Sequence, residues 1–205
     1  MSQWVEWVKQ LQSIGQAGKA YSKDKFDLER FEQLTTIAHE MFAELSNTPV
    51  KRVSELFIPE TGYPTPKVDL RAAVIKDNKI LLVREREDDC WSLPGGWADV
   101  SETPSQGIIR EVFEESGYVV NSPRLVVVKD RDVHPYYPKF PYHIYKMFFL
   151  CQFESGEAMT NIEISDIGFF GLDELPRLSE GRVLPSDIEL MFEYFNDADK
   201  PVYVD

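Results

Sequence analysis

The segment 103–117 combines a strong helix signal with a concentration of acidic side chains. The tetrapeptide Thr-Pro-Ser-Gln at 103–106 supplies a capping residue, a proline at the first helical position and a glutamine at the third. A helix is therefore expected to begin at Pro104 and to end near Gly117. At about 100° per residue, one side of this helix carries the carboxylates of Glu111, Glu114 and Glu115. The other side, expected to face the core, carries Ile109, Val112 and Phe113.

Carboxylates gathered on one helix face repel each other unless a cation lies among them. The cost is about 0.2–0.5 kcal/mol for each pair three or four residues apart. Carboxylate oxygens that converge on one point suit a hard divalent cation such as Mg²⁺, which takes oxygen ligands and keeps several waters. The alternative is an ordinary solvated helix face. Gly95 and Gly96 precede the helix and would let backbone carbonyls and a substrate approach closely.

The spacing of fixed residues extends beyond these acids. Gly96 is followed after five residues by Glu102, and after seven more by Arg-Glu-Val-Phe-Glu-Glu-Ser-Gly-Tyr at 110–118. This arrangement resembles the signature of the Nudix hydrolases, G-x5-E-x7-R-E-U-x-E-E-x-G-U, in which U is a bulky apolar residue. Seven residue identities agree across 23 positions, and Tyr118 stands where an aliphatic residue is commoner. The resemblance implies an α/β fold, the α/β/α sandwich with a mixed sheet that the family uses.

The resemblance also implies an activity and a metal. Family members hydrolyse a nucleoside diphosphate linked to another moiety, with water attacking one phosphorus and divalent metals bridging the phosphates. Such metals act as Lewis acids and as activators of the water. The implied cofactor is Mg²⁺, with Mn²⁺ as a substitute. The implied metal ligands are Glu111, Glu114, Glu115 and the backbone carbonyl of Gly95 or Gly96.

Two other residues of the signature have roles that the resemblance leaves partly open. Arg110 would orient the glutamates. It could also form a helix-surface pair with Glu114, four residues away, and both roles can hold together. Glu102 would brace the loop or reach a metal through water.

The general base is expected to be a carboxylate. Several candidates are kept because family members differ in which carboxylate they use. It can be a glutamate of the signature, Glu114 or Glu115, or a carboxylate in a later loop. The later candidates are Glu163 and Asp166, in the stretch before a predicted strand. Their alternative role is that of solvated loop acids.

Residues outside the signature are expected to select the substrate, above all the aromatic stretch 130–143. The candidates for stacking on a base are Tyr136, Tyr137, Phe140 and Tyr142. The candidates for contact with phosphate or sugar are Arg131, His134, Lys139, Arg84 and Arg86. The alternative for the aromatic stretch is a packing lid without substrate contact.

The rest of the chain predicts two regions joined by a linker. Apolar residues recur at helical spacing over 3–17, where Gly15 and Gly18 are stop signals, and again over 24–46. A short helical piece is expected to follow at 50–57. Together these predict an N-terminal helical domain at 1–57. Three prolines and a glycine mark a linker at 58–67. A strand-rich domain then covers 68–205. Its predicted strands are 68–75, 79–83, 119–120, 125–129, 143–153 and 168–172, and a helix capped by Ser186 and Glu189 follows.

The helical region and the linker resemble a bacterial subgroup of Nudix hydrolases that includes CDP-choline pyrophosphatases and proteins labelled ADP-ribose pyrophosphatases. In that subgroup the enzyme is a homodimer, and the helical domain helps to form the interface and the substrate pocket. The apolar stripe with Trp4 and Trp7 is an independent reason to expect such an interface.

Charge and targeting signals narrow the partners. With 22 basic and 35 acidic residues the chain carries a net charge of −13, which argues against duplex nucleic acid and anionic membranes as partners. Without a signal sequence or an apolar run long enough for a membrane span, a cytoplasmic location is expected. Cys90 and Cys151 have neither disulfide nor zinc spacing.

The expected function is metal-dependent hydrolysis of the diphosphate bond of CDP-choline or ADP-ribose. One alternative is processing of RNA 5′ ends, which the same chemistry permits and the acidic charge disfavours. A second is a Nudix-like ligand-binding module without turnover, which the intact glutamate set disfavours.

Overall fold

The computed structural model describes residues 3–57 and 62–205. The first four residues of the expected linker, 58–61, lie outside the described residues. The chain divides into two compact units, one of Met1–Pro66 with Lys139–His143 and the other of Lys67–Pro138 with Ile144–Asp205. The segment 139–143, predicted to belong to the strand-rich domain, thus groups with the helical unit. No helix in the described ranges is long and apolar enough to cross a membrane.

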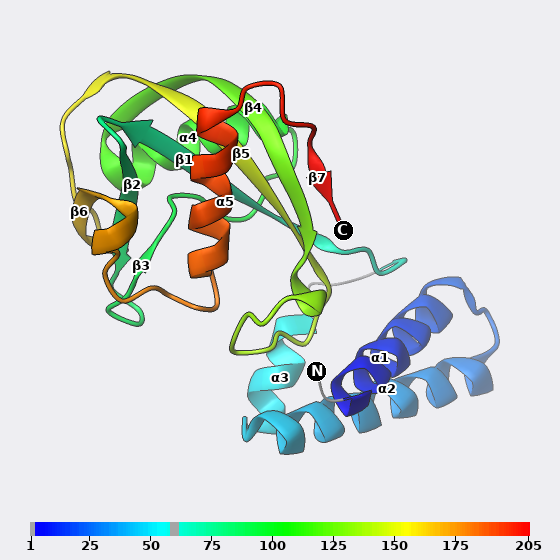
Figure 1. The fold of residues 1–205 in the computed structure, drawn as a ribbon. Coiled ribbons are helices and arrows are strands. Elements are labelled where there is room, and N and C mark those ends of the chain that lie inside the picture. The colour runs from blue at the N-terminus through cyan, green and yellow to red at the C-terminus, as the bar shows by residue number, and fades with distance from the viewer. Residues whose placement is uncertain (1–2, 58–61) are drawn as a thin grey trace. The chain divides into compact units, whose positions relative to one another are not determined.

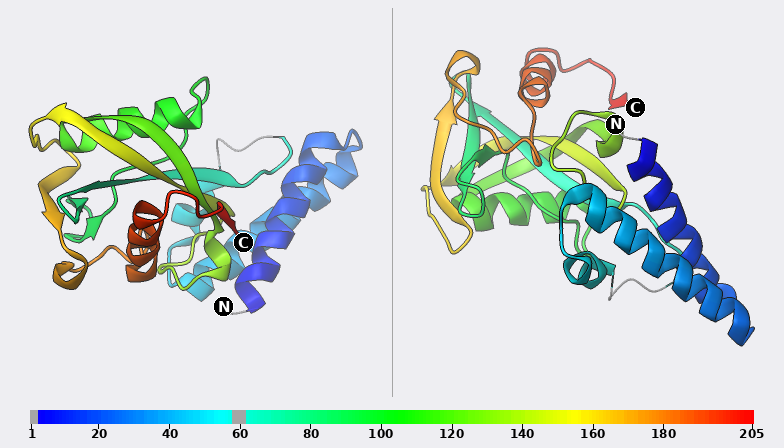
Figure 2. Two further views of the ribbon diagram at one scale, coloured as in Figure 1. Left: turned by 45° about the horizontal axis from the view of Figure 1, so that its top comes forward. Right: turned by 90° about the horizontal axis from the view of Figure 1, so that it is seen from below.

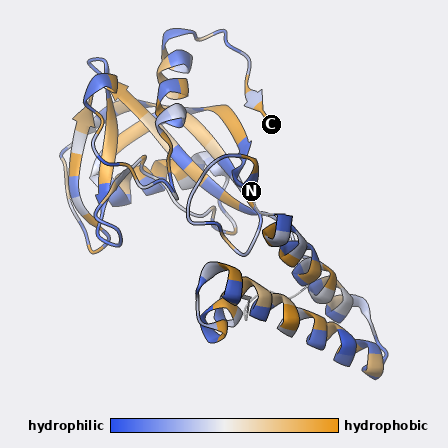
Figure 3. Cartoon of the chain, turned by 60° about the horizontal axis from the view of Figure 1, so that its bottom comes forward, coloured by the Kyte–Doolittle hydropathy of each residue, from blue (hydrophilic) through white to orange (hydrophobic). Residues whose placement is uncertain are grey.

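The first unit is built on three helices, α1 (Gln3–Tyr21), α2 (Lys25–Ser46) and α3 (Val50–Phe57). Asp24 caps α2 by accepting hydrogen bonds from the backbone N–H groups of Phe26 and Asp27. Apolar and polar residues alternate along the helices (Figure 3). The apolar faces meet in a small core of Val8, Ala38, Phe42, Ala43 and Val53.

Two glycines predicted to stop the first helix instead lie inside it. A Cβ atom at Gly15 would stand 2.5 Å from Cγ2 of Thr35, and one at Gly18 would overlap the ring of Phe31. Both contacts are with α2, so these glycines allow close packing of two helices. The stop prediction was wrong because tertiary contact, and not local propensity, accounts for both residues.

The second unit contains a mixed sheet whose seven strands are β1 (Lys67–Lys76), β2 (Lys79–Glu85), β3 (Trp91–Ser92), β4 (Tyr118–Asp130), β5 (Ile144–Gly156), β6 (Ile164–Phe170) and β7 (Tyr203–Val204). The order is β3-β2-β1-β5-β4-β7, and β6 pairs with β2 (Figure 1). β1 runs parallel to β5, whereas β4 and β5 are antiparallel. Short 3-10 turns lie at Arg131–Val133 and Leu172–Glu174.

The strands agree with the predicted pattern, with a few differences. The β1–β2 hairpin turns at Asp77 and Asn78, which both have positive φ, as a tight two-residue turn requires. The two strands expected at 119–120 and 125–129 form one strand, β4, whose register against β5 shifts three times. β6 begins at Ile164, four residues earlier than expected, so Asp166 lies within it.

Two helices cover opposite faces of the sheet, α4 (Pro104–Ser116) and α5 (Pro185–Asn196) (Figure 2). Alternate residues of β1 pack into two hydrophobic cores, one on each face of the sheet. Leu70, Ala72 and Val74 cluster with α4. Ala73 and Ile75 cluster with α5. Each fully buried side chain of the size of leucine or isoleucine contributes about 1.5–3 kcal/mol to the burial free energy.

The start of α5 differs from the predicted capping box of Ser186 and Glu189. The helix begins at Pro185, and the side chain of Asp187 accepts a hydrogen bond of 2.8 Å from the backbone N–H of Leu184. Asp187 is almost fully buried, so the carboxylate that caps the start of α5 lies inside the domain.

Candidate active site

The helix α4 begins and ends as its sequence predicts. The N-cap Thr103 side chain accepts from the backbone N–H of Gln106 at 3.2 Å, and the Gln106 side chain accepts from the backbone N–H of Thr103 at 2.9 Å. This capping box satisfies two donors at the helix start. Gly117 ends the helix with φ 74°.

The three glutamates of α4 differ in depth. The exposed fraction of the side chain is 55% for Glu114 and 14% for Glu111, and that of the Glu115 residue is 7%. Glu115 follows the buried stripe of Ile108 and Val112 at helical spacing. Phe113, predicted to face the core, is 47% exposed. That prediction was wrong because it assumed that all three acids lie on the outer face.

The positively charged side chain of Arg110 lies among the carboxylates and offsets their mutual repulsion. Its guanidinium donates to Glu102 at 2.9 Å, to Glu111 at 3.0 Å and to Glu114 at 2.8 Å. It also reaches Asp99 at 3.3 Å. Hydrogen bonding to Glu102 is the main reason why the pKa of Arg110 is raised, and the same contact lowers the pKa of Glu102. The predicted pair with Glu114 is present, together with contacts to Glu102 and Glu111.

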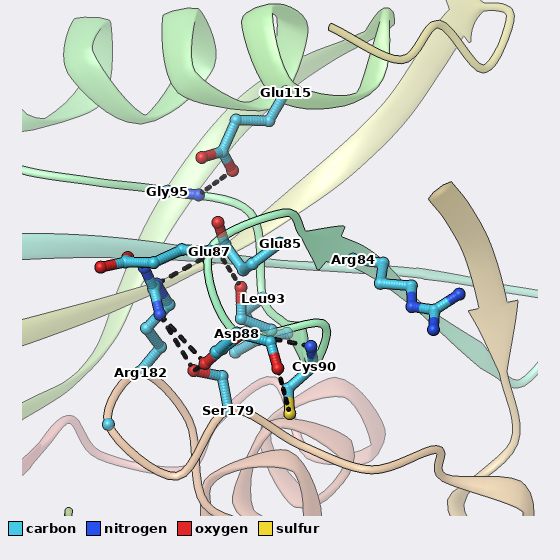
Figure 4. Close-up of polar contacts among 12 residues, drawn as sticks. Arg84, Glu85, Glu87, Asp88, Cys90, Leu93, Gly95, Glu115, Ser179 and Arg182 are labelled. Carbon is cyan, nitrogen blue, oxygen red and sulfur yellow. Dashed lines mark hydrogen bonds and ion pairs between the residues drawn. The ribbon is translucent and has the colours of Figure 1, made fainter. Parts of the chain in front are cut away.

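Glu115 lies outside this cluster of charges. Its carboxylate accepts a hydrogen bond of 2.8 Å from the backbone N–H of Gly95 (Figure 4). Burial raises the pKa of Glu115 to about 8, although the charge of Arg71 and the Gly95 hydrogen bond act in the opposite direction. Burial likewise raises the pKa of Glu111. A neighbouring cation would favour the ionised form of both groups.

The loop before α4 is held tightly against β1. The backbone N–H of Ala72 donates to the carbonyl of Pro94 at 2.9 Å, and that of Leu70 donates to the carbonyl of Gly96 at 2.8 Å. Gly95, with φ 139°, lies so close to β1 that a Cβ atom would overlap the carbonyl oxygen of Leu70. Within the described residues, the Gly95 carbonyl accepts no hydrogen bond, whereas the Gly96 carbonyl is occupied.

The loop that carries Glu163 meets the other end of α4. The backbone N–H of Met159 donates to the Ser116 carbonyl at 3.0 Å, and a Cβ atom at Gly117 would stand 2.5 Å from the carbonyl oxygen of Glu157. Glu163 is exposed at the end of this loop. Asp166 is also exposed, and its carboxylate accepts from the backbone N–H of Ile167 at 2.9 Å.

The basic residues predicted to meet phosphate already have protein partners. Arg84 pairs with Asp89 at 2.8 Å and is partly exposed. Arg86 donates to the Asn161 carbonyl at 3.2 Å. Arg131 is 1% exposed and donates to the carbonyls of Pro138 and Gly181 at 2.6 and 3.2 Å. The structure thus places Arg84 and Arg86 at the surface and Arg131 in the interior.

The aromatic stretch is also divided between interior and surface. Tyr136 has no exposed surface, and its hydroxyl donates to Asp187 at 2.7 Å, so its ring is not available for base stacking in this conformation. Tyr137 is 71% exposed. His134 lies 2.9 Å from the carboxylate of Asp205. Phe140 belongs to the first unit, where its ring packs on Tyr142 at 5.6 Å.

Sequence reasoning missed a buried charged group beside the loop of Gly95. Arg71 donates to Asp69 at 2.9 Å and to the Leu93 carbonyl at 3.0 Å, and Lys146 pairs with the same Asp69. Burial opposes ionisation of Asp69, but Arg71 and Lys146 outweigh it and lower its pKa. Burial lowers the pKa of Lys146 to about 8. Asp69 and Arg71 at alternate positions of an apolar strand were the available signal.

A second missed group joins the end of β2 to the chain before α5. Arg182 contacts Glu85 at 3.3 Å, Glu87 at 2.5 Å and Asp88 at 3.3 Å (Figure 4). Glu85 is buried and accepts a hydrogen bond of 2.8 Å from Ser92. Its charge adds to those that raise the pKa of Glu115.

Comparison with protein families accounts for both parts of the chain. Residues 2–57 match a model described as a UDP-X-like, N-terminal oligomerisation domain of Nudix proteins. Residues 66–191 match the NUDIX domain.

Similar proteins extend over the same length. YjhB of Bacillus subtilis (strain 168), named provisionally as an ADP-ribose pyrophosphatase, is 41% identical over 204 residues, which cover 100% of this chain and 98% of that protein. A crystal structure of UDP-X diphosphatase is 34% identical, with a TM-score of 0.64 and coverage of 100% and 98%. A crystal structure of an ADP-ribose pyrophosphatase from Streptococcus suis 89-1591 is 37% identical, with a TM-score of 0.63 and coverage of 69% and 100%.

The close approach at Gly117 predicts a large stability loss for Gly117→Ala. A side chain there meets a left-handed backbone and a carbonyl oxygen, so a loss of about 2–5 kcal/mol is expected. Gly62 has φ 90°, and no atom of the described residues lies within 4 Å of where a Cβ would stand, so it is a matched control. Its alanine variant should lose no more than about 2 kcal/mol. Urea denaturation measures both, and equal losses would contradict the steric contact with Glu157.

Proposed function

The chain belongs to the Nudix hydrolase family, and from this premise we propose that it hydrolyses the diphosphate bond of CDP-choline or ADP-ribose. The observation that carries the proposal is the buried carboxylate of Glu115, 2.8 Å from the backbone N–H of Gly95 and beside an α4 face of further glutamates. The names of the similar proteins support the class of substrate, a nucleoside diphosphate linked to another group. The products would be a nucleoside monophosphate and a phosphorylated partner.

The donor set fits a divalent cation, Mg²⁺ with Mn²⁺ as a substitute. The carboxylate oxygens would come from Glu111, Glu114 and Glu115. The Glu111 carboxylate lies close to the loop, because a Cβ atom at Gly96 would stand 3.1 Å from it. Of the two loop carbonyls we favour that of Gly95, because the Gly96 carbonyl already accepts from Leu70. When bound, the cation would neutralise phosphate charge and activate water.

The chain's own residues would prepare this reaction in two ways. Arg110 holds Glu111 and Glu114 in place by hydrogen bonds of 3.0 and 2.8 Å. The backbone N–H of Gly95 would orient Glu115 through a hydrogen bond of 2.8 Å. Preorganised groups of this kind lower the barrier because they do not reorganise during the reaction.

For the general base we keep Glu163, in the loop before β6, and Asp166, within β6, beside the glutamates of α4. The Glu163 loop is joined to the carboxyl end of α4 by hydrogen bonds, which supports a role near Glu114. Asp166 uses one carboxylate oxygen on the backbone of β6. We therefore favour Glu163 over Asp166. For substrate contact, Arg84, Arg86 and the exposed Tyr137 remain the candidates that lie at the surface.

A substrate panel tests the proposed activity. The protein with Mg²⁺ is incubated with CDP-choline, ADP-ribose, UDP-linked sugars, nucleoside triphosphates and RNA with a 5′-triphosphate. Cleavage of a nucleoside diphosphate compound to the monophosphate is expected. Turnover of RNA alone would favour the RNA-processing alternative, and no turnover on any member would contradict an enzymatic role on these substrates.

Substitution of Glu115 by glutamine tests the site. Glutamine keeps the shape and can still accept from Gly95, but it removes the charge that a cation needs. We expect kcat to fall at least about a hundredfold. Glu154→Gln, on the exposed end of β5 where the side chain accepts from Asn121, is the control and should leave kcat unchanged. A near-normal rate for Glu115→Gln would refute its role.

We also propose that the chain forms a homodimer through its N-terminal helices. Trp4 and Trp7 pack edge to face with ring centroids 5.1 Å apart and remain 54% and 45% exposed, as in an apolar surface that lacks its partner. Light scattering should give twice the protomer mass of 23.7 kDa. Trp7→Glu should shift the protein to the protomer mass. A wild-type protomer at micromolar concentration would contradict the dimer.

A further inference from the structure

The segment between β5 and β6 lies against the carboxyl end of α4 along its length. At its start, the Glu157 carbonyl passes so close to Gly117 that a Cβ atom there would stand 2.5 Å away. Two residues on, Met159 donates its backbone N–H to the Ser116 carbonyl at 3.0 Å. The segment then reaches Asn161, which makes the contacts that distinguish it from an ordinary surface loop.

Asn161 uses both ends of its side-chain amide. Its Nδ2 donates to the backbone carbonyl of Glu114 at 2.6 Å. Its Oδ1 accepts from the backbone N–H groups of Glu163 and Ile164 at 2.8 and 2.7 Å. One side chain thus joins the last turn of α4 to the backbone of the loop acid. An amide offers both a donor and an acceptor, whereas an ionised aspartate has acceptors alone.

Arg86 also binds this segment. Its backbone N–H donates to the Glu163 carbonyl at 2.8 Å, and its Nε donates to the Asn161 carbonyl at 3.2 Å. The backbone of Glu163 is therefore bonded through both its N–H and its carbonyl, while its side chain stays exposed. A fixed backbone beneath a free carboxylate is the arrangement that positions an acid.

We propose that Asn161 is a positioning residue, which docks the loop onto α4 so that the Glu163 carboxylate is held beside the catalytic glutamates. This inference rests on the proposed function, in which Glu163 is the favoured loop acid. A simpler role for Asn161 is to satisfy a carbonyl at the end of α4, where helices leave carbonyls without intrahelical partners. In that role Asn161 would contribute to the stability of the fold. Any effect of its loss on kcat would then be independent of Glu163.

Two substitutions at Asn161 separate the docking from the local turn. Asn161→Ala removes all three hydrogen bonds. Asn161→Asp keeps acceptors for the N–H groups of Glu163 and Ile164 but loses the donor to the Glu114 carbonyl. Because a small misplacement of a catalytic group is costly, both variants should lower kcat about 10- to 100-fold with KM within about threefold of wild type. Asn121→Ala, which removes a hydrogen bond to Glu154 between β4 and β5, should leave kcat unchanged.

A double-mutant cycle and amide hydrogen exchange complete the test. If Asn161 acts through Glu163, then Asn161→Ala added to Glu163→Gln should lower kcat by less than about threefold further. Exchange of the Glu163 and Ile164 amides should be faster in Asn161→Ala and stay slow in Asn161→Asp. This second readout needs no turnover.

The outcomes distinguish the inference from the function on which it rests. An active wild type, a slow Glu163→Gln and an Asn161→Ala with normal kcat would overturn the positioning role alone. Losses that multiply in the double variant would overturn it too. If wild type turns over no substrate, the proposed function fails, and unchanged amide exchange in Asn161→Ala would then separately overturn the docking.

Discussion

Electrostatic repulsion within α4 is the constraint on which the rest of the site depends. Glu111 and Glu114 share one helix surface with Glu102 nearby, and Arg110 contacts all three at 2.8–3.0 Å. Arg110 thereby makes the acidic surface compatible with a stable helix. Its own position is set by the start of α4 at Thr103, because the helix phase decides which side chains share a face.

Glu115 is the carboxylate that Arg110 does not reach. It is buried next to the Gly95 loop, with a hydrogen bond from the Gly95 backbone and a pKa raised to about 8 by burial. Burial of a carboxylate is unfavourable unless another charge compensates it. The charge of Arg71 provides part of that compensation, and we infer that a divalent cation provides the rest. The loop can present the Gly95 carbonyl to it because β1 holds Pro94 and Gly96 on either side.

Local signals in the sequence were sufficient for the elements but not for their burial. The capping box at Thr103 is local chemistry and was predicted at the right residues, and the tight turn at Asp77 and Asn78 falls between the strands predicted at 68–75 and 79–83. Glu115 points inward and Phe113 outward because of the way α4 packs on the sheet. The spacing of apolar residues could not reveal this, since the buried side of the helix ends in an acid. The glycines of α1 were misread for the same reason.

The candidate site shows a similar division. The residues of the signature lie close together because one helix and the loop before it carry them. Tyr136 was placed among the substrate contacts by composition alone, yet its hydroxyl is bonded to Asp187, a partner distant in the sequence. Asp69, Arg71 and Lys146 were missed because buried ion pairs between strands become evident only when the register of β1 and β5 is known.

Anomalous scattering from Mn²⁺ in crystals of the wild-type protein would locate the cation that we infer beside Glu115. We expect a manganese peak about 2.1 Å from the carboxylate of Glu115 and from the Gly95 carbonyl, with Glu111 as a further ligand. A peak at acids away from α4, with Glu115 still bonded only to the Gly95 N–H, would contradict it.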